Sequence, residues 1–329
     1  MVHIFKLSRQ ALARVLVVGT TLAFGCSSTP AQEDYPSKAI HVVIGFPAGS
    51  GADVVTRFFA SRVSELAGQP LVVENKPGAF SAIAFANVGA AKPDGYKILW
   101  TGSSIMSGGR HMIKNMPYDP NKDFVPVAAF ADFPFILVVG NRNKAKDLAA
   151  LITELKGKSR VLYGHFNPPS YLATAYFNSR IGISAEPVVY SGAATALPDL
   201  ENGTLDFMVM DGAFAVGSIK SGKIRAMAVT SNLRAAELPD VPTMIEAGLG
   251  TFEFTPWWGA WFPAGTPEPI VEKFSGWFKE VARQPQTIDF LRKIAVFPVA
   301  EGREAVTARI EADTKMWDKL AHEVGMTPQ

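Results

Sequence analysis

The sequence contains a single cysteine, Cys26, among its 329 residues. One cysteine excludes a disulfide framework and any zinc site that needs two or more thiolate ligands. The sequence also lacks an excess of either charge, because 32 Lys and Arg face 30 Asp and Glu and the formal net charge is +2. This near balance excludes a protein that binds nucleic acid through clustered basic residues. Hydrophobic residues make up 48% of the chain, which is ample for a packed core.

The common catalytic motifs are missing as well. The sequence contains no G-x-S-x-G elbow, no H-E-x-x-H and no G-x-G-x-x-G. Residues 217–224 (GSIKSGKI) approach a P-loop, but Ile224 replaces the Ser or Thr that would hold magnesium, and a predicted strand follows instead of a helix. The four histidines that follow residue 31 are scattered without metal-ligand spacing: His41, His111, His165 and His322. We therefore expect a protein that is not an enzyme and uses no metal or cofactor.

Residues 1–31 differ in composition from the rest of the chain. Three basic residues and no acidic ones accompany the apolar run 15–25 (VLVVGTTLAFG), which is too short to span a bilayer. This pattern predicts a secretory signal peptide and a periplasmic protein. Cleavage after Ala31 gives a soluble protein, whereas removal of residues 1–25 leaves a lipoprotein anchored at Cys26. Without residues 1–31, 29 Lys and Arg face 30 Asp and Glu, so the net charge becomes −1.

Short apolar runs alternate with helical periodicity from residue 39 onward. Strands are predicted at 40–46, 71–74 and 97–101, with helices at 53–67 and 82–91 between them. The second half repeats this rhythm, with strands at 161–164, 187–190, 205–210 and 224–230, helices at 171–180 and 193–200, and C-terminal helices at 270–283, 286–294 and 304–324. Such alternation predicts βαβ units and mostly parallel sheets.

Two extended apolar stretches, 124–139 and 252–262, separate these halves. Two such strands would connect two α/β lobes as a hinge. We therefore predict one lobe from residues 35–138 plus 254–329 and a second from residues 139–253. Trp257, Trp258 and Trp261 lie on the returning stretch, where they either fill the core or line a cleft.

Glycine- and serine-rich turns follow several predicted strands. Residues 45–53 (GFPAGSGAD) connect a strand to a helix, and the N–H groups at such a helix start favour a carboxylate or phosphate. The same residues equally fit a tight turn with Asp53 as the N-terminal cap or as an acidic residue of the first helical turn. Similar turns occur at 190–195 and at 165–171, where Ser170 is also a suitable N-cap. Because ligands of α/β sheets gather at such turns, we expect a cleft for a small anion.

The order and spacing of several motifs resemble one known family, the Bug-type periplasmic solute receptors of tripartite tricarboxylate transporters. The resemblance runs from about residue 35 to the C-terminus. The motifs that carry it are 35–40 (YPSKAI), 46–53 (FPAGSGAD), 74–79 (ENKPGA), 92–96 (KPDGY), 117–124 (PYDPNKDF), 192–206 (GAATALPDLENGTLD), 223–231 (KIRAMAVTS), 238–248 (LPDVPTMIEAG) and 262–267 (FPAGTP).

The resemblance implies an α/β type II periplasmic-binding-protein fold, with two lobes, two hinge strands and a ligand cleft between them. It further implies a monomeric receptor that captures a small carboxylate, such as a di- or tricarboxylate, an amino acid or an aromatic acid. The receptor would deliver this ligand to membrane permease subunits. Carried over by position, the ligand-binding residues would be Phe46, Ala48, Gly49, Ser50, Gly51, Asp53, Thr101, Ser103, Ser170, Tyr171, Tyr190, Ala193 and Asp211.

Departures from the family pattern fall at several of the expected contacts. Ser50 replaces a usual glycine, Tyr171 a common histidine and Ser191 a frequent basic residue, whereas Arg110 stands where proline is common. Losing a cation at 191 and gaining one at 110 would move or remove a second carboxylate site. Two other functions stay open from the sequence, namely a ligand sensor for a membrane signalling protein and a periplasmic enzyme with Asp53 or Asp211 as its base.

Overall fold

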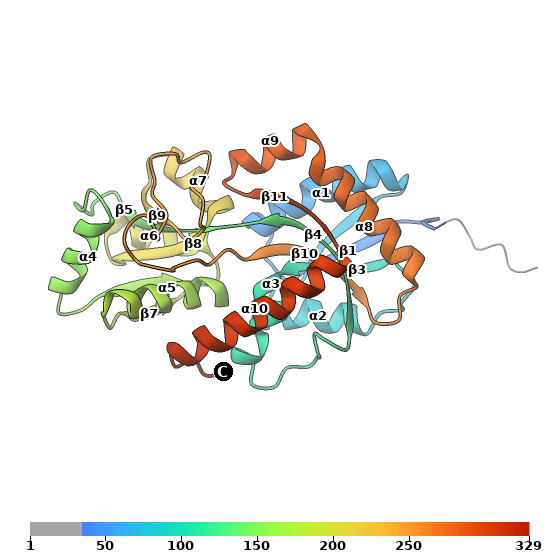
Figure 1. Ribbon diagram of the computed structural model, residues 1–329, viewed down its shortest axis with the longest axis horizontal. Coiled ribbons are helices and arrows are strands. Elements are labelled where there is room, and N and C mark those ends of the chain that lie inside the picture. The colour runs from blue at the N-terminus through green and yellow to red at the C-terminus, as the bar shows by residue number, and fades with distance from the viewer. Residues whose placement is uncertain (1–34, 329) are drawn as a thin grey trace, which may run out of the picture. The chain divides into compact units, whose positions relative to one another are not determined.

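The computed structural model describes residues 35–328 and contains two β-sheets with helices packed on them (Figure 1). The predicted leader, its cleavage after Ala31 and the proposed lipid anchor at Cys26 lie outside the described residues. None of the described helices is both long and apolar enough to cross a bilayer.

The first sheet has the strand order β11-β4-β10-β3-β1-β2. β1 pairs in parallel with β2 and β3, whereas β10 runs antiparallel to β3 and β4, and β11 antiparallel to β4. The sheet is therefore mixed, which corrects the expectation of mostly parallel pairing. Its strands are β1 (Ile40–Ile44), β2 (Leu71–Asn75), β3 (Lys97–Gly102), β4 (Phe124–Asp132), β10 (Trp257–Pro263) and β11 (Phe297–Gly302).

The second sheet has the order β7-β6-β8-β5-β9 and is mixed in the same way. β6 pairs in parallel with β7 and β8, and β5 runs antiparallel to β8 and β9. Its strands are β5 (Phe135–Gly140), β6 (Leu162–His165), β7 (Glu186–Val189), β8 (Phe207–Asp211) and β9 (Ile224–Val229).

Helices cover the sheets and begin at the ends of several strands. α1 follows β1, α5 follows β6, α6 follows β7 and α7 follows β8, so four helix N-termini face the same region between the sheets. The helices are α1 (Gly51–Ala67), α2 (Ala82–Gly89), α3 (Ser103–Gly108), α4 (Leu148–Gly157), α5 (Pro168–Ile181), α6 (Ala193–Asn202), α7 (Gly212–Lys220), α8 (Glu268–Arg283), α9 (Pro285–Lys293) and α10 (Arg303–Glu323), with 3₁₀ turns at Ala79–Ser81 and Gly109–His111.

The chain passes between the sheets at two places that lie side by side. β4 continues into β5 through Phe133 and Pro134, and the chain returns through residues 255–256 into β10. The Phe133 N–H donates to the Pro256 carbonyl at 2.8 Å, so the two crossing segments are hydrogen-bonded to each other. Residues 135–138, assigned to the first lobe from the sequence, belong to β5 of the second sheet. The continuous apolar run hides this change of sheet, which coincides with a proline that cannot donate to a ladder.

Aromatic side chains fill the core of the first sheet. Phe130 of β4 stacks on Phe278 of α8 with ring centroids 5.2 Å apart, and Trp100 of β3 lies 4.8 Å from the same ring. α10 contacts α3 and β4 beside the first sheet and also α5 beside the second (Figure 1). This long helix therefore joins elements of both sheets, in addition to the two crossing segments.

Candidate ligand-binding site

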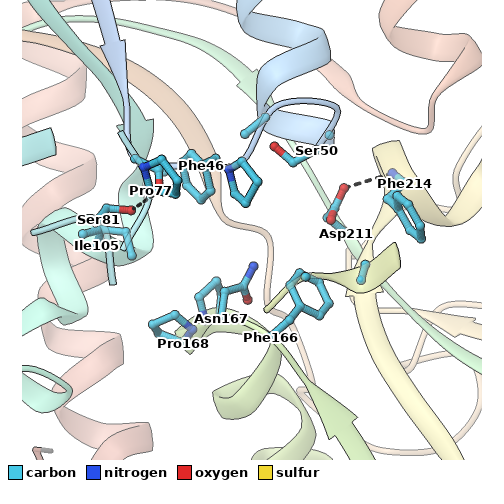
Figure 2. A pocket seen from close by; sticks show the side chains of 18 of the residues that line it. Phe46, Ser50, Pro77, Ser81, Ile105, Phe166, Asn167, Pro168, Asp211 and Phe214 are labelled. Atoms are coloured by element: carbon cyan, nitrogen blue, oxygen red, sulfur yellow. Dashed lines mark hydrogen bonds between the residues drawn. The ribbon is translucent and has the colours of Figure 1, made fainter. Parts of the chain in front are cut away.

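A cavity of about 290 Å³ lies between the two sheets, close to the size of small-molecule sites in general. The loop after β1, the Pro77–Ser81 segment and the start of α3 form one side of it, and the starts of α5, α6 and α7 form the other. Figure 2 shows this arrangement, with Phe46, Pro77 and Ser50 above the cavity and Phe166 and Asn167 below it. Both sheets therefore supply its walls.

The loop before α1 is held in shape by its own side chains. Gly49 has a φ of +78°, a conformation that favours glycine. Its N–H donates to Asp53 Oδ2 at 2.9 Å, and the Asp53 N–H donates to Ser50 Oγ at 3.3 Å. The N–H groups of Gly51 and Ala52, at the first turn of α1, have no acceptor earlier in the helix and border the cavity.

Asp53 organises this loop and does not line the cavity. It is only 4% exposed and accepts hydrogen bonds from Arg57 Nε at 3.0 Å and Asn75 Nδ2 at 2.8 Å. Burial alone would raise the pKa of Asp53, but the hydrogen bonds from Arg57, the Gly49 N–H and Asn75 hold it below its usual value. Asp53 is thus an ionised carboxylate in the first turn of α1, and the N-cap is Ser50.

The other three helix starts differ in what they offer a ligand. α6 has Gly192 as its N-cap without a side-chain hydrogen bond, and Ala193 and Ala194 of its first turn border the cavity. α5 begins with Pro168 and Pro169, which have no N–H to donate. α7 is capped by the carboxylate of Asp211, which disfavours a second anion at that helix start. α1 is capped by the neutral hydroxyl of Ser50, and α6 begins at Gly192, so α1 and α6 are the helix starts in this lining that favour an anion.

Asp211 brings a carboxylate to the cavity wall. Its Oδ1 accepts from the Phe214 N–H at 3.0 Å, as the dashed line in Figure 2 marks. The same oxygen lies against the start of α1, since a Cβ at Gly51 would be only 2.3 Å from it. Burial raises the pKa of Asp211 to about 6, against the lowering effect of the backbone N–H groups. Within residues 35–328, no Lys, Arg or His side chain lines this cavity.

Aromatic rings form most of the remaining wall. Phe133 stacks on Trp258 with centroids 4.1 Å apart and planes inclined by 19°. These two rings and the ring of Phe46 lie around Gly102, where a Cβ would be in ordinary van der Waals contact with all three. The aromatic residues of the lining are Phe46, Phe80, Phe133, Phe135, Phe166, Tyr190, Phe214 and Trp258.

Three consecutive residues in the cavity loop have an unusual backbone conformation. Ala79, Phe80 and Ser81 have φ values of +46°, +51° and +72°, which are costly for residues other than glycine. Ser81 Oγ donates to the Gly45 carbonyl at 3.1 Å and closes this segment onto the loop after β1. Phe80 borders the cavity and stays 41% exposed, so it lies at the rim.

The structure brings eight of the predicted residues to the cavity and places the others elsewhere. Those at the cavity are Phe46, Ala48, Gly49, Ser50, Gly51, Tyr190, Ala193 and Asp211, and those elsewhere are Asp53, Thr101, Ser103, Ser170 and Tyr171. The five residues outside the cavity are engaged in local hydrogen bonds or packing, because their positions along a strand or helix direct their side chains away from the cavity.

Particular contacts explain these displaced residues. Ser103 Oγ accepts from the Trp257 N–H at 3.3 Å, and Thr101 is buried in β3. The N-cap of α5 is Asn167, so the expectation that Ser170 is the N-cap is wrong. Ser170 is instead the third residue of the helix and completes a capping box with Asn167. Tyr171 packs edge-on against His165 with centroids 5.1 Å apart.

Arg110, considered as a cation for the pocket, pairs instead with Asp318 of α10 at 2.6 Å and is not among the lining residues. Sequence reasoning missed Phe80, Phe133, Phe135, Phe166 and Phe214 at the cavity, because apolar residues carry no binding signal in a sequence. Among the described residues, no group of three or more His, Cys, Asp or Glu is arranged to hold a metal ion.

Sequence relatives point to one family. A family model described as the tripartite tricarboxylate transporter family receptor matches residues 55–326. Protein BugT of Bordetella pertussis is 28% identical over 94% of this chain and 96% of its own length. A UPF0065 protein from the tcbD-tcbE intergenic region of Pseudomonas sp. (strain P51) is 31% identical and covers 93% of both chains.

Solved structures of similar proteins superpose on this one. Rpa4515 of R. palustris, solved with adipate, has a TM-score of 0.87 at 29% identity, covering 90% of this chain and 100% of that one. MatC from Rhodopseudomonas palustris, with bound malate, has a TM-score of 0.80 at 27% identity, covering 87% and 100%. The periplasmic binding protein BugD, at a TM-score of 0.83 and 29% identity over 90% of this chain and all of its own, confirms the predicted periplasmic-binding-protein fold. With its family model spanning most of the described residues, this chain belongs to the tripartite tricarboxylate transporter receptor family of periplasmic solute-binding proteins.

Proposed function

We propose that this protein captures a small carboxylate in the cavity between its sheets and delivers it to the membrane permease subunits of a tripartite tricarboxylate transporter. The observation that carries this proposal is the pair of helix starts, α1 and α6, whose first-turn N–H groups border the cavity. Each charge-assisted hydrogen bond to a carboxylate contributes about 1.5–3 kcal/mol. A few such bonds hold the ligand without a basic side chain.

Relatives support a carboxylate as the ligand class. Rpa4515 was solved with adipate and MatC with malate, and both share the fold of this chain. Of the two carboxylates considered as the base of a hydrolase, Asp53 is tied to Arg57 and Asn75 inside the loop, and Asp211 is the one that lies at the cavity. We propose that the protein acts as a monomer, as the resemblance to the Bug-type receptors implies.

Export by residues 1–31 remains part of the proposal, with a lipid anchor at Cys26 as the alternative. The mass of the chain purified from its native cells distinguishes the two forms. A chain that begins at Gln32 supports the soluble form, and an acylated chain that begins at Cys26 supports the anchored one.

Thermal unfolding with a carboxylate panel tests the capture function. A ligand present at about 100 times its dissociation constant stabilises the folded protein by about 2.7 kcal/mol, so at least one of adipate, malate, L-phenylalanine and 3-phenylpropionate should raise the melting temperature. Adipamide, which has the shape of adipate without its charge, is the matched control and should cause no shift. The proposal is wrong if no carboxylate shifts the melting temperature, or if adipamide shifts it as much as adipate does.

A further inference from the structure

The cavity contains a carboxylate that no cation of its wall neutralises. Asp211 and Tyr190 are the ionisable side chains among the described lining residues. The Tyr190 hydroxyl is already engaged, since it donates to Asp199 Oδ2 at 2.7 Å. Asp211 receives only backbone N–H groups, and burial without a cationic partner is unfavourable for an ionised carboxylate. A positively charged group of a ligand would provide the missing partner.

The aromatic residues of the cavity wall also favour a positively charged group. The faces of aromatic rings carry negative potential and attract ammonium groups, most strongly where water is excluded. Phe133 and Trp258 stack on each other in the cavity lining. Phe214 lies three residues after Asp211, in the first turn of α7, and Figure 2 shows its ring beside Asp211. Aromatic walls beside a carboxylate therefore suit a cationic amine with an apolar body.

The start of α1, beside Asp211, favours a negatively charged group instead. The N–H groups of Gly51 and Ala52 favour a carboxylate there. Asp211 Oδ1 lies directly against Gly51, so the site for an anion and the site for a cation adjoin. A carboxylate and an amine that occupy both sites must be joined by very few atoms, as they are in an α-amino acid.

Resting on the proposed capture of carboxylates, we propose that the ligand is a zwitterion, namely an amino acid with an apolar or aromatic side chain. Its carboxylate binds the start of α1, its ammonium group pairs with Asp211, and its side chain lies among the aromatic rings. A dicarboxylate fits this wall less well, because a second carboxylate near Asp211 would meet a like charge with no basic side chain to offset it.

Isothermal titration calorimetry with matched compounds tests this assignment. L-Phenylalanine and 3-phenylpropionate share one skeleton and differ by the amine, so the amino acid should bind at least about tenfold more tightly. Phenethylamine, which lacks the carboxylate, should also bind more weakly than L-phenylalanine. Adipate serves as the dicarboxylate and should bind more weakly than L-phenylalanine.

The variant Asp211→Asn removes the charge and retains a good helix N-cap. It should bind L-phenylalanine and 3-phenylpropionate with similar affinity, and it should bind adipate more tightly than the unmodified protein does, because the like charge is removed. Asp147→Asn is the matched control, because Asp147 caps α4 through the Ala150 N–H at 2.8 Å and lies outside the cavity. The control should keep the preference for the amine.

The outcomes separate the two proposals. If 3-phenylpropionate or adipate binds the unmodified protein as tightly as L-phenylalanine, the zwitterion assignment is overturned and carboxylate capture stands. Retention of the amine preference in folded Asp211→Asn also overturns it. If none of the carboxylates binds, both proposals are overturned together.

Discussion

Gly49 and Asp53 show how single residues prepare the loop before α1 for an anion. Gly49 has positive φ and open space where a Cβ would be, so its backbone conformation, not crowding, requires glycine. Asp53 accepts the Gly49 N–H and thereby directs the loop while leaving the N–H groups of Gly51 and Ala52 at the cavity. The carboxylate that the sequence suggested as a ligand contact therefore acts on the loop itself.

We expect Gly49→Val to abolish carboxylate binding. Valine is strained at positive φ, which costs about 1–2 kcal/mol and drives the loop to another conformation. Gly182→Val is the matched control, because Gly182 has a φ of +69°, open space around it and a place at the end of α5 outside the cavity. Urea unfolding should show similar losses for both variants, whereas calorimetry with the best carboxylate of the panel should show lost binding only for Gly49→Val.

Normal binding by folded Gly49→Val would place the carboxylate away from α1.

The strained segment at Phe80 is a feature that the sequence does not predict. Positive φ is expected of glycine, so nothing in the residues Ala79, Phe80 and Ser81 predicts it. Only the contact of Ser81 with Gly45, from a segment 36 residues away, accounts for the observed conformation.

The segments that connect the two sheets are tied to α10 by a network of charged and aromatic side chains. Asp132, the last residue of β4, accepts from Arg309 of α10 at 2.6 Å. The Arg309 guanidinium lies 5.0 Å from the centre of the Trp257 ring at the start of β10, and Trp257 Nε1 donates to Asp313 at 2.8 Å. Burial raises the pKa of Asp132 to about 6 although Arg309 acts to lower it.

We expect Arg309→Met to destabilise the fold by about 3 kcal/mol, because it leaves Asp132 buried without its cation. Arg160→Met is the control, since the Arg160–Glu186 pair is exposed and its loss should cost less than about 1 kcal/mol. Denaturant unfolding of the two variants beside the unmodified protein measures both. An equal decrease in the free energy of unfolding for both variants would show that the Asp132–Arg309 pair stabilises the fold no more than an exposed pair does.

For the helices and strands, periodicity predicted where the elements lie better than which elements pair with one another. The alternation of apolar runs identified most strands, and the spacing on 53–67 identified α1 to within two residues of its start. Helices α3, α4 and α7 and strand β11 were missed, and so were the antiparallel pairs that make each sheet mixed. Pairs such as Asp132 and Arg309 join residues 177 positions apart, which no local pattern reveals.

The whole molecule determines the cavity, because its wall combines short segments from both sheets. The ordered family motifs predicted the fold, since they recur in the family's order and spacing between residues 35 and 267. They did not predict the aromatic wall, because Phe133, Phe166 and Phe214 meet only when the sheets face each other. The contact between α1 and α7, where Gly51 adjoins Asp211 and Ala213, marks where the two sides of the cavity meet.

This contact gives a test of closure as a property of the whole protein. A Cβ at Gly51 would lie 2.3 Å from Asp211 Oδ1 and 2.8 Å from Ala213 Cβ, so Gly51→Ala forces α1 and α7 apart. Alanine also favours the interior of a helix over glycine by about 1 kcal/mol, and by less at the first helical position, which Gly51 occupies. We therefore expect a protein that is at least as stable without ligand but binds it about tenfold more weakly.

Gly217→Ala is the matched control, because Gly217 lies within α7 and a Cβ there meets no atom within 4 Å. It should gain stability by the same helix effect and keep its affinity. Thermal unfolding without ligand and calorimetry with ligand measure the two quantities separately. Unchanged or increased stability together with weaker binding in Gly51→Ala, but not in Gly217→Ala, would show that ligand binding requires the close approach of α1 and α7. Unchanged affinity in Gly51→Ala would contradict this requirement, and with it the adjoining sites for carboxylate and amine.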